Sequence, residues 1–471
     1  MKGQQCPRLL WHTVRKLLPE KTLAEKQKLS QGHEFEKYAH QLFPDAVNLA
    51  DLEFKDNLEK TKEFIEQKKI IFEAGIQVDN LFLRADILEP VGDGWNLYEI
   101  KASTKQKPEH IPDLAFQKYV CEKLGLNIKR CFVLFLNKEY IKQGDIDAKE
   151  LSTIEEVTEK VDLITDVEEN TQKYLEIMEQ EEMPDITISM KCNKPYLCPL
   201  KDVCWGTLPE NNVLHLTNWR MYWKLFDQDI VDMKDVPEGT ELKPKDQVIV
   251  EGELNNKIMV SKEHIKHFLA SLKYPLCHLD FETFDTAVPI FDKSRPWQKI
   301  PFQYSVHIQH KDGKLDHYEY LAEGDEDPRI KLVENLKEHT KGLGSVIVFN
   351  KSFEIGVLNK LAEDFPEHED WIKDVLSRIV DLALPFENFY YYNPTQKESY
   401  SIKKVLPAIT GKGYSELEIS NGGDASAQYF YTHITKEMEG KEEVRKNLLK
   451  YCGLDTEGMI WIIDELNKLI V

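Results

Sequence analysis

The stretch PLCHLDFETF, residues 275–284, decides the fold of the C-terminal half. Asp280 and Glu282 stand two apart in it, so on a strand both carboxylates leave the same face. Leu279 and Phe281 occupy the opposite face. Paired carboxylates that alternate with apolar residues are typical of a metal site on a rigid strand. The stretch therefore predicts the first strand of an α/β unit that carries a metal site.

Two segments further along the chain carry the acidic residues that would complete this site. The strand SVIVFN leads into a helix that bears Glu354, and YCGLDTEGM places Tyr451 and Asp455 one helical turn apart. Together with the first strand, they bring four carboxylates toward one point. Four carboxylates can bind two divalent ions, Mg²⁺ or Mn²⁺, that clamp the attacking water and the leaving oxygen of a phosphodiester. A solvated acidic face is the simpler interpretation of each segment taken alone.

The order and spacing of these residues resemble the DnaQ-like, or DEDD, 3'-5' exonucleases. The family motifs D-x-E, N-x-x-F-D and Y-x-x-x-D are matched here by Asp280 and Glu282, by Asn350, Phe353 and Glu354, and by Tyr451 and Asp455. The resemblance implies an RNase H-like domain in which these carboxylates bind metal. The tyrosine points to the DEDDy branch, in which its hydroxyl orients the attacking water. Glu354 departs from the family, which has aspartate at that position.

Three further residues are candidates for substrate binding in this half. In the arrangement that the resemblance implies, Lys403 and Lys404 of ESYSIKKVLPAI lie where a nucleic-acid backbone would pass, and Asn350 of the second motif is assigned with them. The same arrangement places Asp381 at the end of a strand near the site. The start of a solvated helix explains the two lysines equally well.

A second acidic group lies in the N-terminal half. The strand ADIL carries Asp86, and the next strand, YEIKAS, carries Glu99 and Lys101 two apart on one face. Two carboxylates and a lysine there can bind a divalent cation and hold a nucleophilic water beside it, which is the chemistry of phosphodiester hydrolysis. An edge strand with an exposed ion pair is the competing interpretation.

Helices on either side of these strands offer three more candidates. Glu36, in the preceding helix GHEFEKYA, can complete the metal shell. Gln117 and Tyr119, in the following helix, can contact the substrate backbone.

Four cysteines predict one metal site. Cys6 stands alone near the N-terminus, and the other three lie close together in KCNKPYLCPLKDVCW. Thiolates are the ligands that iron–sulfur clusters select, and a shared cluster would close a long segment of chain. The spacing is neither a C-x₂-C pair nor a ferredoxin run, so zinc stays open. Four unrelated buried thiols are the remaining alternative. The four candidate ligands are Cys6, Cys192, Cys198 and Cys204.

The N-terminal pattern as a whole resembles the RecB-type PD-(D/E)XK nucleases with an iron–sulfur staple, a group that includes the AddB nuclease domain and the CRISPR adaptation exonucleases. The resemblance implies a [4Fe-4S] cluster on the four cysteines and metal-dependent DNA cleavage, with Asp86 and Glu99 on the metal and Lys101 on the nucleophile. Two departures stand out: the family's G-x-x-x-H is here Gly32 followed by Glu36, and the last three cysteines are evenly spaced. The matching residues in chain order are Glu36, Asp86, Glu99, Lys101, Gln117 and Tyr119.

Length and composition bound the architecture. The 471 residues, 41% of them hydrophobic, predict two or three globular α/β domains. We expect a PD-(D/E)XK domain over 1–210, a helical connecting module over 211–272 and a DEDD exonuclease domain over 273–471. No stretch is apolar enough to span a membrane and no signal-peptide core is evident, which favours a cytoplasmic protein with reduced thiols.

The net charge of −21 counts against a nucleic-acid partner, because phosphate binding relies on Lys and Arg. Acidic residues concentrate in stretches such as IEEVTEKVDLITDVEEN, which we interpret as solvent-facing helices, so a local basic groove is compatible with that charge.

Taken end to end, the chain resembles a bacterial family that fuses a RecB-like iron–sulfur nuclease to a DnaQ-like exonuclease, with the signatures CPRLLW, HLDFETF and YSIKKVLPAI. The resemblance implies a DNA nuclease with two phosphodiesterase sites that trims ends or single strands. It does not imply the biological role: DNA repair, recombination and defence against phage all stay open, as does a helicase or defence-system partner. One alternative is an RNA exonuclease, because DEDD chemistry does not distinguish the sugars. The other is a catalytically impaired iron–sulfur scaffold or redox sensor that binds nucleic acid.

Overall fold

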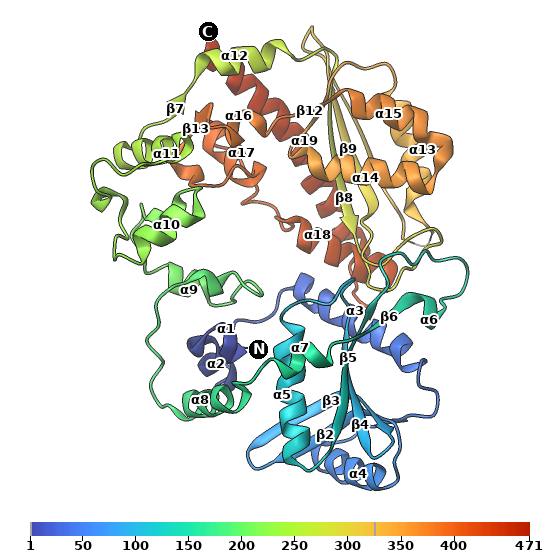
Figure 1. Ribbon diagram of the computed structural model, residues 1–471. Helices are drawn as coiled ribbons and strands as arrows, with labels where there is room; N and C mark the ends of the chain where they lie inside the picture. The colour runs from blue at the N-terminus through green and yellow to red at the C-terminus, as the bar shows by residue number, and fades with distance from the viewer. Residues whose placement is uncertain (1, 325) are drawn as a thin grey trace. The chain divides into compact units, whose positions relative to one another are not determined.

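The computed structural model describes residues 2–324 and 326–471, which fold into two compact units (Figure 1). Unit 1 comprises Met1–Gly206 and Thr286–Gln298, and unit 2 comprises Thr207–Asp285 and Lys299–Val471. Both combine a β-sheet with helices, so the chain is mixed α/β, as the sequence predicts. The residues of the expected connecting module, 211–272, fall within unit 2.

Unit 1 is built on a six-stranded sheet in the order β1-β2-β3-β4-β5-β6. The pairs β1/β2 and β4/β5 are parallel and the other neighbours are antiparallel. The strands are β1 (Val47–Asn48), β2 (Ile71–Val78), β3 (Leu81–Val91), β4 (Gly94–Lys101), β5 (Ile128–Leu136) and β6 (Ser152–Glu156). The helices are α1 (Lys2–Gln5), α2 (Pro7–Val14), α3 (Leu23–His40), α4 (Phe54–Glu66), α5 (His110–Lys123), α6 (Ala148–Leu151), α7 (Thr158–Asp162), α8 (Val167–Glu179) and α9 (Lys201–Trp205), with a 3₁₀ turn η1 (Met190–Cys192).

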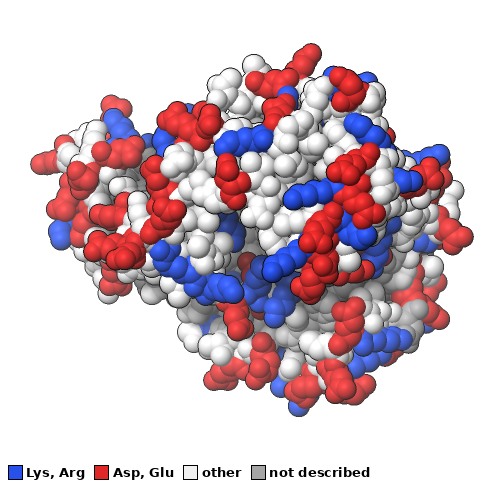
Figure 2. Space-filling model, turned by 90° about the horizontal axis from the view of Figure 1, so that it is seen from below, with Lys and Arg blue, Asp and Glu red and all other residues white. Residues whose placement is uncertain are grey.

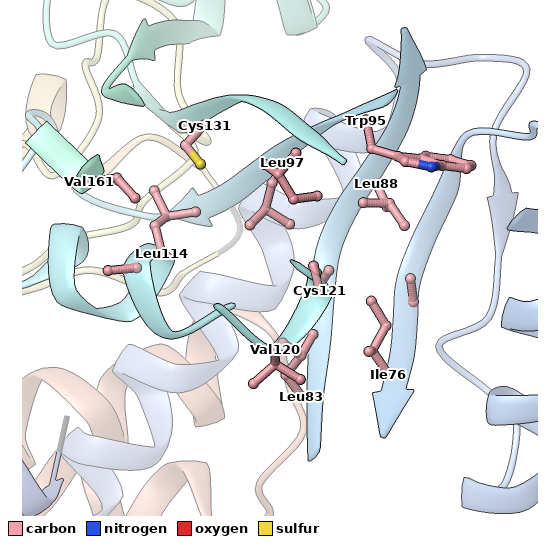
Figure 3. Close-up of a cluster of buried hydrophobic side chains, with 14 of the residues drawn as sticks. Ile76, Leu83, Leu88, Trp95, Leu97, Leu114, Val120, Cys121, Cys131 and Val161 are labelled. Atoms are coloured by element: carbon pink, nitrogen blue, oxygen red, sulfur yellow. The ribbon is translucent and has the colours of Figure 1, made fainter. Parts of the chain in front are cut away.

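Helix α5 packs across β2, β3, β4 and β5 and forms the main core of unit 1 (Figure 3). Leu114, Val120 and Cys121 of α5 are fully buried against side chains of the sheet such as Leu88 and Leu97. Burial of such side chains stabilises a fold by about 1.5–3 kcal/mol each. The core therefore fixes α5 above the strands that carry the first acidic group.

Two segments of unit 1 differ from the helical pattern that the sequence suggests. Helix α3 starts at a capping box of Thr22 and Glu25 but stops at His40, because Pro44 cannot continue it, and the chain then forms β1. The acidic stretch after Ser152 begins as strand β6, which pairs antiparallel with β5, before the helices α7 and α8. Pairing with β5 there overrides the helical preference of the glutamates.

Unit 2 is built on a five-stranded sheet in the order β10-β9-β8-β11-β12. The pairs β10/β9 and β9/β8 are antiparallel, whereas β8/β11 and β11/β12 are parallel. The strands are β8 (Leu276–Phe284), β9 (Ile300–Gln309), β10 (Leu315–Leu321), β11 (Val346–Val348) and β12 (Ile379–Asp381), beside a two-stranded pair of β7 (Met259–Val260) and β13 (Tyr391–Tyr392). The helices are α10 (Trp219–Phe226), α11 (Pro244–Asn255), α12 (Lys262–Ala270), α13 (Pro328–Thr340), α14 (Lys351–Asp364), α15 (Glu369–Ser377), α16 (Leu384–Glu387), α17 (Ile402–Thr410), α18 (Gly422–Tyr429) and α19 (Lys441–Ile470).

The long helix α19 packs along β8 and β9, and α17 and α18 lie beside it (Figure 1). The core of unit 2 lies between the sheet and its helices and includes Leu279 and Phe281 of β8, the side chains that the sequence assigns to the apolar face. Three segments that are far apart in sequence, β8, α14 and α19, are thereby held around one end of the sheet.

The loop between β8 and β9 belongs to unit 1. There, the Ala287 N–H donates to Gln31 Oε1 at 2.9 Å, and Trp297 Nε1 donates to the carbonyl of Ala102 at 2.7 Å. Ala287 and Val288 are buried among the side chains of unit 1.

None of the described helices is long and apolar enough to cross a membrane. Acidic side chains are spread over the face seen in Figure 2, with Lys and Arg interspersed among them. This distribution accords with the net charge of −21.

Candidate metal centres

The acidic residues of the first and third motifs in unit 2 meet in space. Asp280 and Glu282 lie on β8, and Asp455 lies on α19. Each offers one carboxylate oxygen, and these oxygens all lie within 4.8 Å of one another. Among the described residues, it is the one group of three or more acidic, histidine or cysteine ligands this close together. Oxygen ligands at this spacing suit Mg²⁺ or Mn²⁺.

Glu354, in the first turn of α14, lies near this group but is not one of the three residues within 4.8 Å. The side chain is buried, and its Oε2 has no hydrogen-bond partner among the described residues. Its charge acts on Asp280 and Glu282. A buried carboxylate oxygen without a donor is costly, so a bound cation would satisfy it.

The four carboxylates raise one another's affinity for positive charge. Burial and then the charge of Asp455 raise the pKa of Glu282 to about 8, and burial raises the pKa of Glu354 to about 8. Burial also raises the pKa of Asp455 to about 6 and places the pKa of Asp280 well above its usual range, where Asp455 adds to the effect. Like charges that are buried together disfavour ionisation unless a cation joins them.

Tyr451 and Lys403 face the carboxylates. Lys403 Nζ donates to the hydroxyl oxygen of Tyr451 at 2.7 Å; Tyr451 is buried and Lys403 is half-buried. Burial lowers the pKa of Lys403, although Asp455 and Glu282 oppose that shift. Burial, with the nearby charge of Asp455, raises the pKa of Tyr451, so its hydroxyl stays protonated. The pair supplies a hydrogen-bonding hydroxyl and a cation beside the acidic group.

Two further residues reach this group that the sequence motifs do not include. Tyr414, in the loop after α17, donates its hydroxyl to Asp455 Oδ1, and Cys452 Sγ donates to Asp280 Oδ2 at 3.5 Å. Cys452 stands next to Tyr451, so the third motif could have indicated it. Tyr414 lies in an irregular loop, where no periodicity reveals its direction.

The other candidates of unit 2 lie around the group in different ways. Asn350 precedes α14 in the left-handed region (φ +71), and its backbone N–H donates to Asp381 Oδ1 at 3.0 Å. Asp381 also accepts from the N–H groups of Lys351 and Ala383, so it acts as a cap for the start of α14. Lys404 follows Lys403 on α17 and is exposed to solvent.

In unit 1, Asp86 on β3 and Glu99 on β4 lie close to each other, with Lys101 beside them. The Ile100 N–H donates to Asp86 Oδ2 at 2.6 Å, and Lys101 Nζ donates to Glu99 Oε1. Burial and the charge of Glu99 raise the pKa of Asp86, and burial raises the pKa of Glu99. Burial alone would lower the pKa of Lys101, but the charge and hydrogen bond of Glu99 outweigh it and raise that pKa.

The flanking candidates of unit 1 divide into two groups. Gln117 of α5 is buried and donates to Glu99 Oε2, so it belongs to the acidic group. Tyr119 instead donates to Glu168 at 3.2 Å, because residues two apart on a helix point to nearly opposite faces. The structure therefore brings Gln117 to the carboxylates and directs Tyr119 toward α8.

Glu73 of β2 is an acidic neighbour that the motifs do not include. It has φ +57, an uncommon value for a strand residue, and its carbonyl accepts from Asn57 Nδ2 at 2.9 Å. Burial and the charge of Glu36 raise its pKa, which places Glu36 of α3 beside it. In the sequence, Glu73 could have been identified as a candidate because it is the single charged residue inside the apolar stretch IIFEAGIQV. Strained residues of this kind cluster at functional sites.

The four candidate cysteine ligands are neighbours in unit 1, although no three of their sulfurs form a group as close as the three carboxylates of unit 2. Cys198 is buried with Leu9 and Leu200, and Cys6 and Cys204 pack against them. The charges of Cys192 and Cys204 act on Cys6, and those of the other three act on Cys198. Burial raises the thiol pKa of Cys6 and of Cys198, so without a bound metal both thiols stay protonated.

Polar contacts support this thiol group from the N-terminal helices. Gln5 Nε2 donates to the carbonyls of Lys191 at 2.9 Å and Tyr196 at 2.6 Å, and Arg8 donates to Cys204 Sγ at 3.5 Å. Four thiols with a nearby arginine are a donor set that fits a bound iron–sulfur cluster or zinc. The donor set by itself does not choose between the two.

Comparison with known proteins gives a family match within unit 2. A domain of unknown function (DUF2779) matches residues 277–401, from β8 to the residue before α17. The matched segment contains Asp280, Glu282 and Glu354, and α19 lies outside it.

The chain is also similar to three curated proteins. It is 29% identical over 247 residues to Uncharacterized protein UU173 of Ureaplasma parvum, which covers 46% of this chain and 34% of that protein. It is 28% identical over 224 residues to Uncharacterized protein MG366 of Mycoplasma genitalium, over 42% of this chain and 33% of that protein. The homologue of MG366 in Mycoplasma pneumoniae is 27% identical over 213 residues, and the chain spans about a third of the length of these relatives.

Proposed function

We propose that this protein is a metal-dependent nuclease with two phosphodiesterase sites, in which unit 2 acts as a 3'-5' exonuclease of the DEDDy type with an RNase H-like fold. The observation that carries the proposal is the meeting of Asp280, Glu282 and Asp455 with their oxygens within 4.8 Å, beside the buried Glu354. These carboxylates come from three separate segments. An accidental cluster of buried acids would be destabilising, so a bound cation is the best account of it.

In unit 2 the four carboxylates would hold Mg²⁺ or Mn²⁺, which supplies Lewis-acid activation and charge neutralisation for phosphodiester hydrolysis. The hydroxyl of Tyr451 lies at the same place and is fixed by Lys403 at 2.7 Å. With a pKa raised by burial, it stays a hydrogen-bond donor and acceptor that can orient a water molecule. Lys403 also offers positive charge to a phosphate.

In unit 1 Asp86 and Glu99 are the candidate ligands of a metal ion. Glu36 and Glu73 are further carboxylates that would complete its ligand shell. Lys101 is the candidate that stabilises the nucleophile, and it is held beside Glu99 and 3.6 Å from Asp113. Gln117 fixes the Glu99 carboxylate through its hydrogen bond. This set of groups is that of a RecB-like PD-(D/E)XK site, and we propose this fold and activity for unit 1.

The four cysteines of unit 1 would hold a [4Fe-4S] cluster. Their thiols come from the first helices and from the loop near residue 200, so a shared cluster would fix the N-terminus to the end of unit 1. The cluster would act as a structural staple, because no candidate substrate contact lies among the four thiols.

The test is cleavage of end-labelled single- and double-stranded DNA and RNA with Mg²⁺ or Mn²⁺. Wild type is compared with Asp280→Asn and with Lys101→Met, and Asp312→Asn, an exposed position of unit 2, serves as control. We expect DNA to be shortened from the 3' end by wild type and control, and each of the two variants to lose one part of the activity.

The result also decides between the alternatives. Cleavage of RNA alone would assign the protein to RNA processing. Tight binding of nucleic acid with no cleavage by any preparation would instead leave a scaffold or sensor, and the nuclease proposal would be abandoned.

A further inference from the structure

A cavity of about 590 Å³ opens in unit 1 between α1, α5, α8 and the turn from β2 to β3. A volume of this size falls in the range of sites that hold small molecules or single groups of a larger ligand, about 300–1,000 Å³. None of the residues that we assign to the two metal centres or to the cysteine group lines it. The cavity is therefore a feature that the proposed chemistry leaves unused.

The cavity adjoins the first acidic group through one residue. Asp113 of α5 lines it, and Asp113 Oδ2 lies 3.6 Å from Lys101 Nζ. Phe116 lines the cavity from the same helix, and Gln117, the next residue, holds Glu99. Asp113 thus links the wall of the cavity to the candidate nucleophile-binding lysine.

The walls combine flat aromatic surface with a few polar groups. Three rings line the cavity, those of Phe82, Phe116 and Tyr174, and Phe82 is 39% exposed. Lys2 and Lys191 lie at its edge, and both are exposed. Proteins bind single-stranded nucleic acids with aromatic faces and nearby cations, because a base stacks on a ring while a lysine binds the phosphate.

We propose that this cavity is a subsite for one nucleobase of a single strand whose phosphate lies at the Asp86 and Glu99 site. The inference rests on the proposed function of unit 1 and specifies its substrate as an unpaired strand. A base within a duplex is stacked and paired and cannot enter a pocket without being extruded. DNA and RNA share the nucleobase, so both are tested.

The cysteine group borders the same cavity. Its wall includes α1 and η1, which are joined by a hydrogen bond from Lys191 Nζ to the Gln4 carbonyl at 3.3 Å. Helix α1 ends one residue before the candidate ligand Cys6, and η1 ends with the candidate ligand Cys192. The thiol group thereby positions one side of the subsite.

The experiment measures affinity for single-stranded DNA and RNA 12-mers that carry one abasic position, moved along the strand, with Ca²⁺ in place of Mg²⁺ to limit cleavage. The variant Asn170→Trp fills the cavity from α8, where Asn170 lines it. Gln172→Trp is the matched control, since Gln172 is exposed on the same helix and does not line the cavity. Melting temperature and circular dichroism check that each variant is folded.

For wild type and the control, we expect one abasic position to weaken binding about 10-fold, the scale of one stacked base. Asn170→Trp should bind the intact strand about 10-fold more weakly and lose the dependence on that position. If Asn170→Trp does not fold, Phe82→Ala removes one ring at a half-exposed turn and should reduce the same dependence.

Position-dependent binding that survives in Asn170→Trp, or in Phe82→Ala where that variant replaces it, would overturn the subsite while leaving the nuclease proposal intact. Absence of any oligonucleotide binding by wild type would instead overturn the proposed function, and the subsite with it. A dependence seen with RNA alone, or with DNA alone, identifies the sugar that the site accepts.

Discussion

The two acidic groups differ in what balances their charge. In unit 1, Glu99 receives hydrogen bonds from Lys101 and Gln117, and Asp86 receives one from the backbone. In unit 2, three carboxylates lie within 4.8 Å of one another beside the buried Glu354, and an oxygen of Glu354 has no partner among the described residues. In the first group a lysine is bonded directly to a carboxylate, whereas in the second Lys403 donates to Tyr451 instead, so the second group gains most from an added cation.

This difference has a chemical consequence. Lys101 pairs with Glu99 and Asp113, so a metal ion that binds Glu99 in unit 1 competes with an ion pair that is already present. Unit 2 needs no such exchange, because Tyr451 and Lys403 already face the carboxylates. We therefore expect unit 2 to bind metal more tightly than unit 1.

The largest expected effect is on the exonuclease activity that we propose for unit 2. Asp280→Asn keeps the shape of the side chain but removes one charged ligand, so it should reduce Mg²⁺-dependent shortening of 3' ends by at least about 100-fold. The measurement is the rate of release of nucleotides from a 3'-labelled strand. Asp312→Asn should retain the wild-type rate, and equal loss in both variants would count against the site.

Lys101→Met tests the acidic group of unit 1, in which Lys101 pairs with Glu99. It should abolish the cleavage that survives in Asp280→Asn, and it leaves the buried Glu99 without its cation, at a cost of about 1–3 kcal/mol in the free energy of unfolding. Single-turnover cleavage and urea unfolding measure the two effects. Lys105→Met, at an exposed position nearby, should change neither. If the Lys101→Met, Asp280→Asn double variant cleaves as fast as Asp280→Asn alone, unit 1 takes no part in the reaction.

Short-range patterns predicted much of the secondary structure and brought candidate residues to the right segments. The alternation in β8 put Asp280 and Glu282 on one face with Leu279 and Phe281 on the other, and the structure has that arrangement. The helical spacing of Tyr451 and Asp455 likewise places both beside Lys403, because a period of 3.6 residues is a local property.

Long-range placement is what the sequence left open. Tyr414 reaches Asp455 from an irregular loop, and Glu73 reaches the first group through a strained backbone held by Asn57. Tyr119, expected with Gln117 to contact the substrate backbone, donates to Glu168, and the substrate contact stays a prediction. Which face of a helix meets a site depends on tertiary packing, which no local pattern contains.

Cys198→Ser examines the third group of ligands, which belongs to unit 1 alone. If the four cysteines hold a [4Fe-4S] cluster, this variant should lose the brown colour, the iron and the acid-labile sulfide of the anaerobic protein. The Lys101-dependent cleavage should fall with them while the Asp280-dependent activity stays. Cys121→Ala, a core thiol outside the group, should keep the colour. Zinc in place of iron and sulfide would reassign the metal.

The charge contrast also predicts a change in stability of the metal-free protein. Asp280→Asn removes one of several like charges that are buried together, so in EDTA it should stabilise unit 2 by about 1 kcal/mol, or about 2–4 °C in melting temperature. Mg²⁺ should raise the melting temperature of wild type more than that of the variant. Differential scanning calorimetry records both shifts. A lower melting temperature of Asp280→Asn in EDTA would mean that the carboxylates are already balanced.

The smallest expected effect comes from Glu354→Asp, which introduces the aspartate of the DEDD motif that this segment resembles. The buried carboxylate keeps its charge but loses one methylene, so stability should fall by about 1 kcal/mol and exonuclease activity should stay within about 10-fold of wild type. Glu354→Gln keeps the length and removes the charge, and it should lose at least about 100-fold. Nucleotide release at saturating Mn²⁺ compares the two variants. If Asp fails and Gln works, then reach rather than charge is what Glu354 contributes, and a neutral oxygen at this position is sufficient.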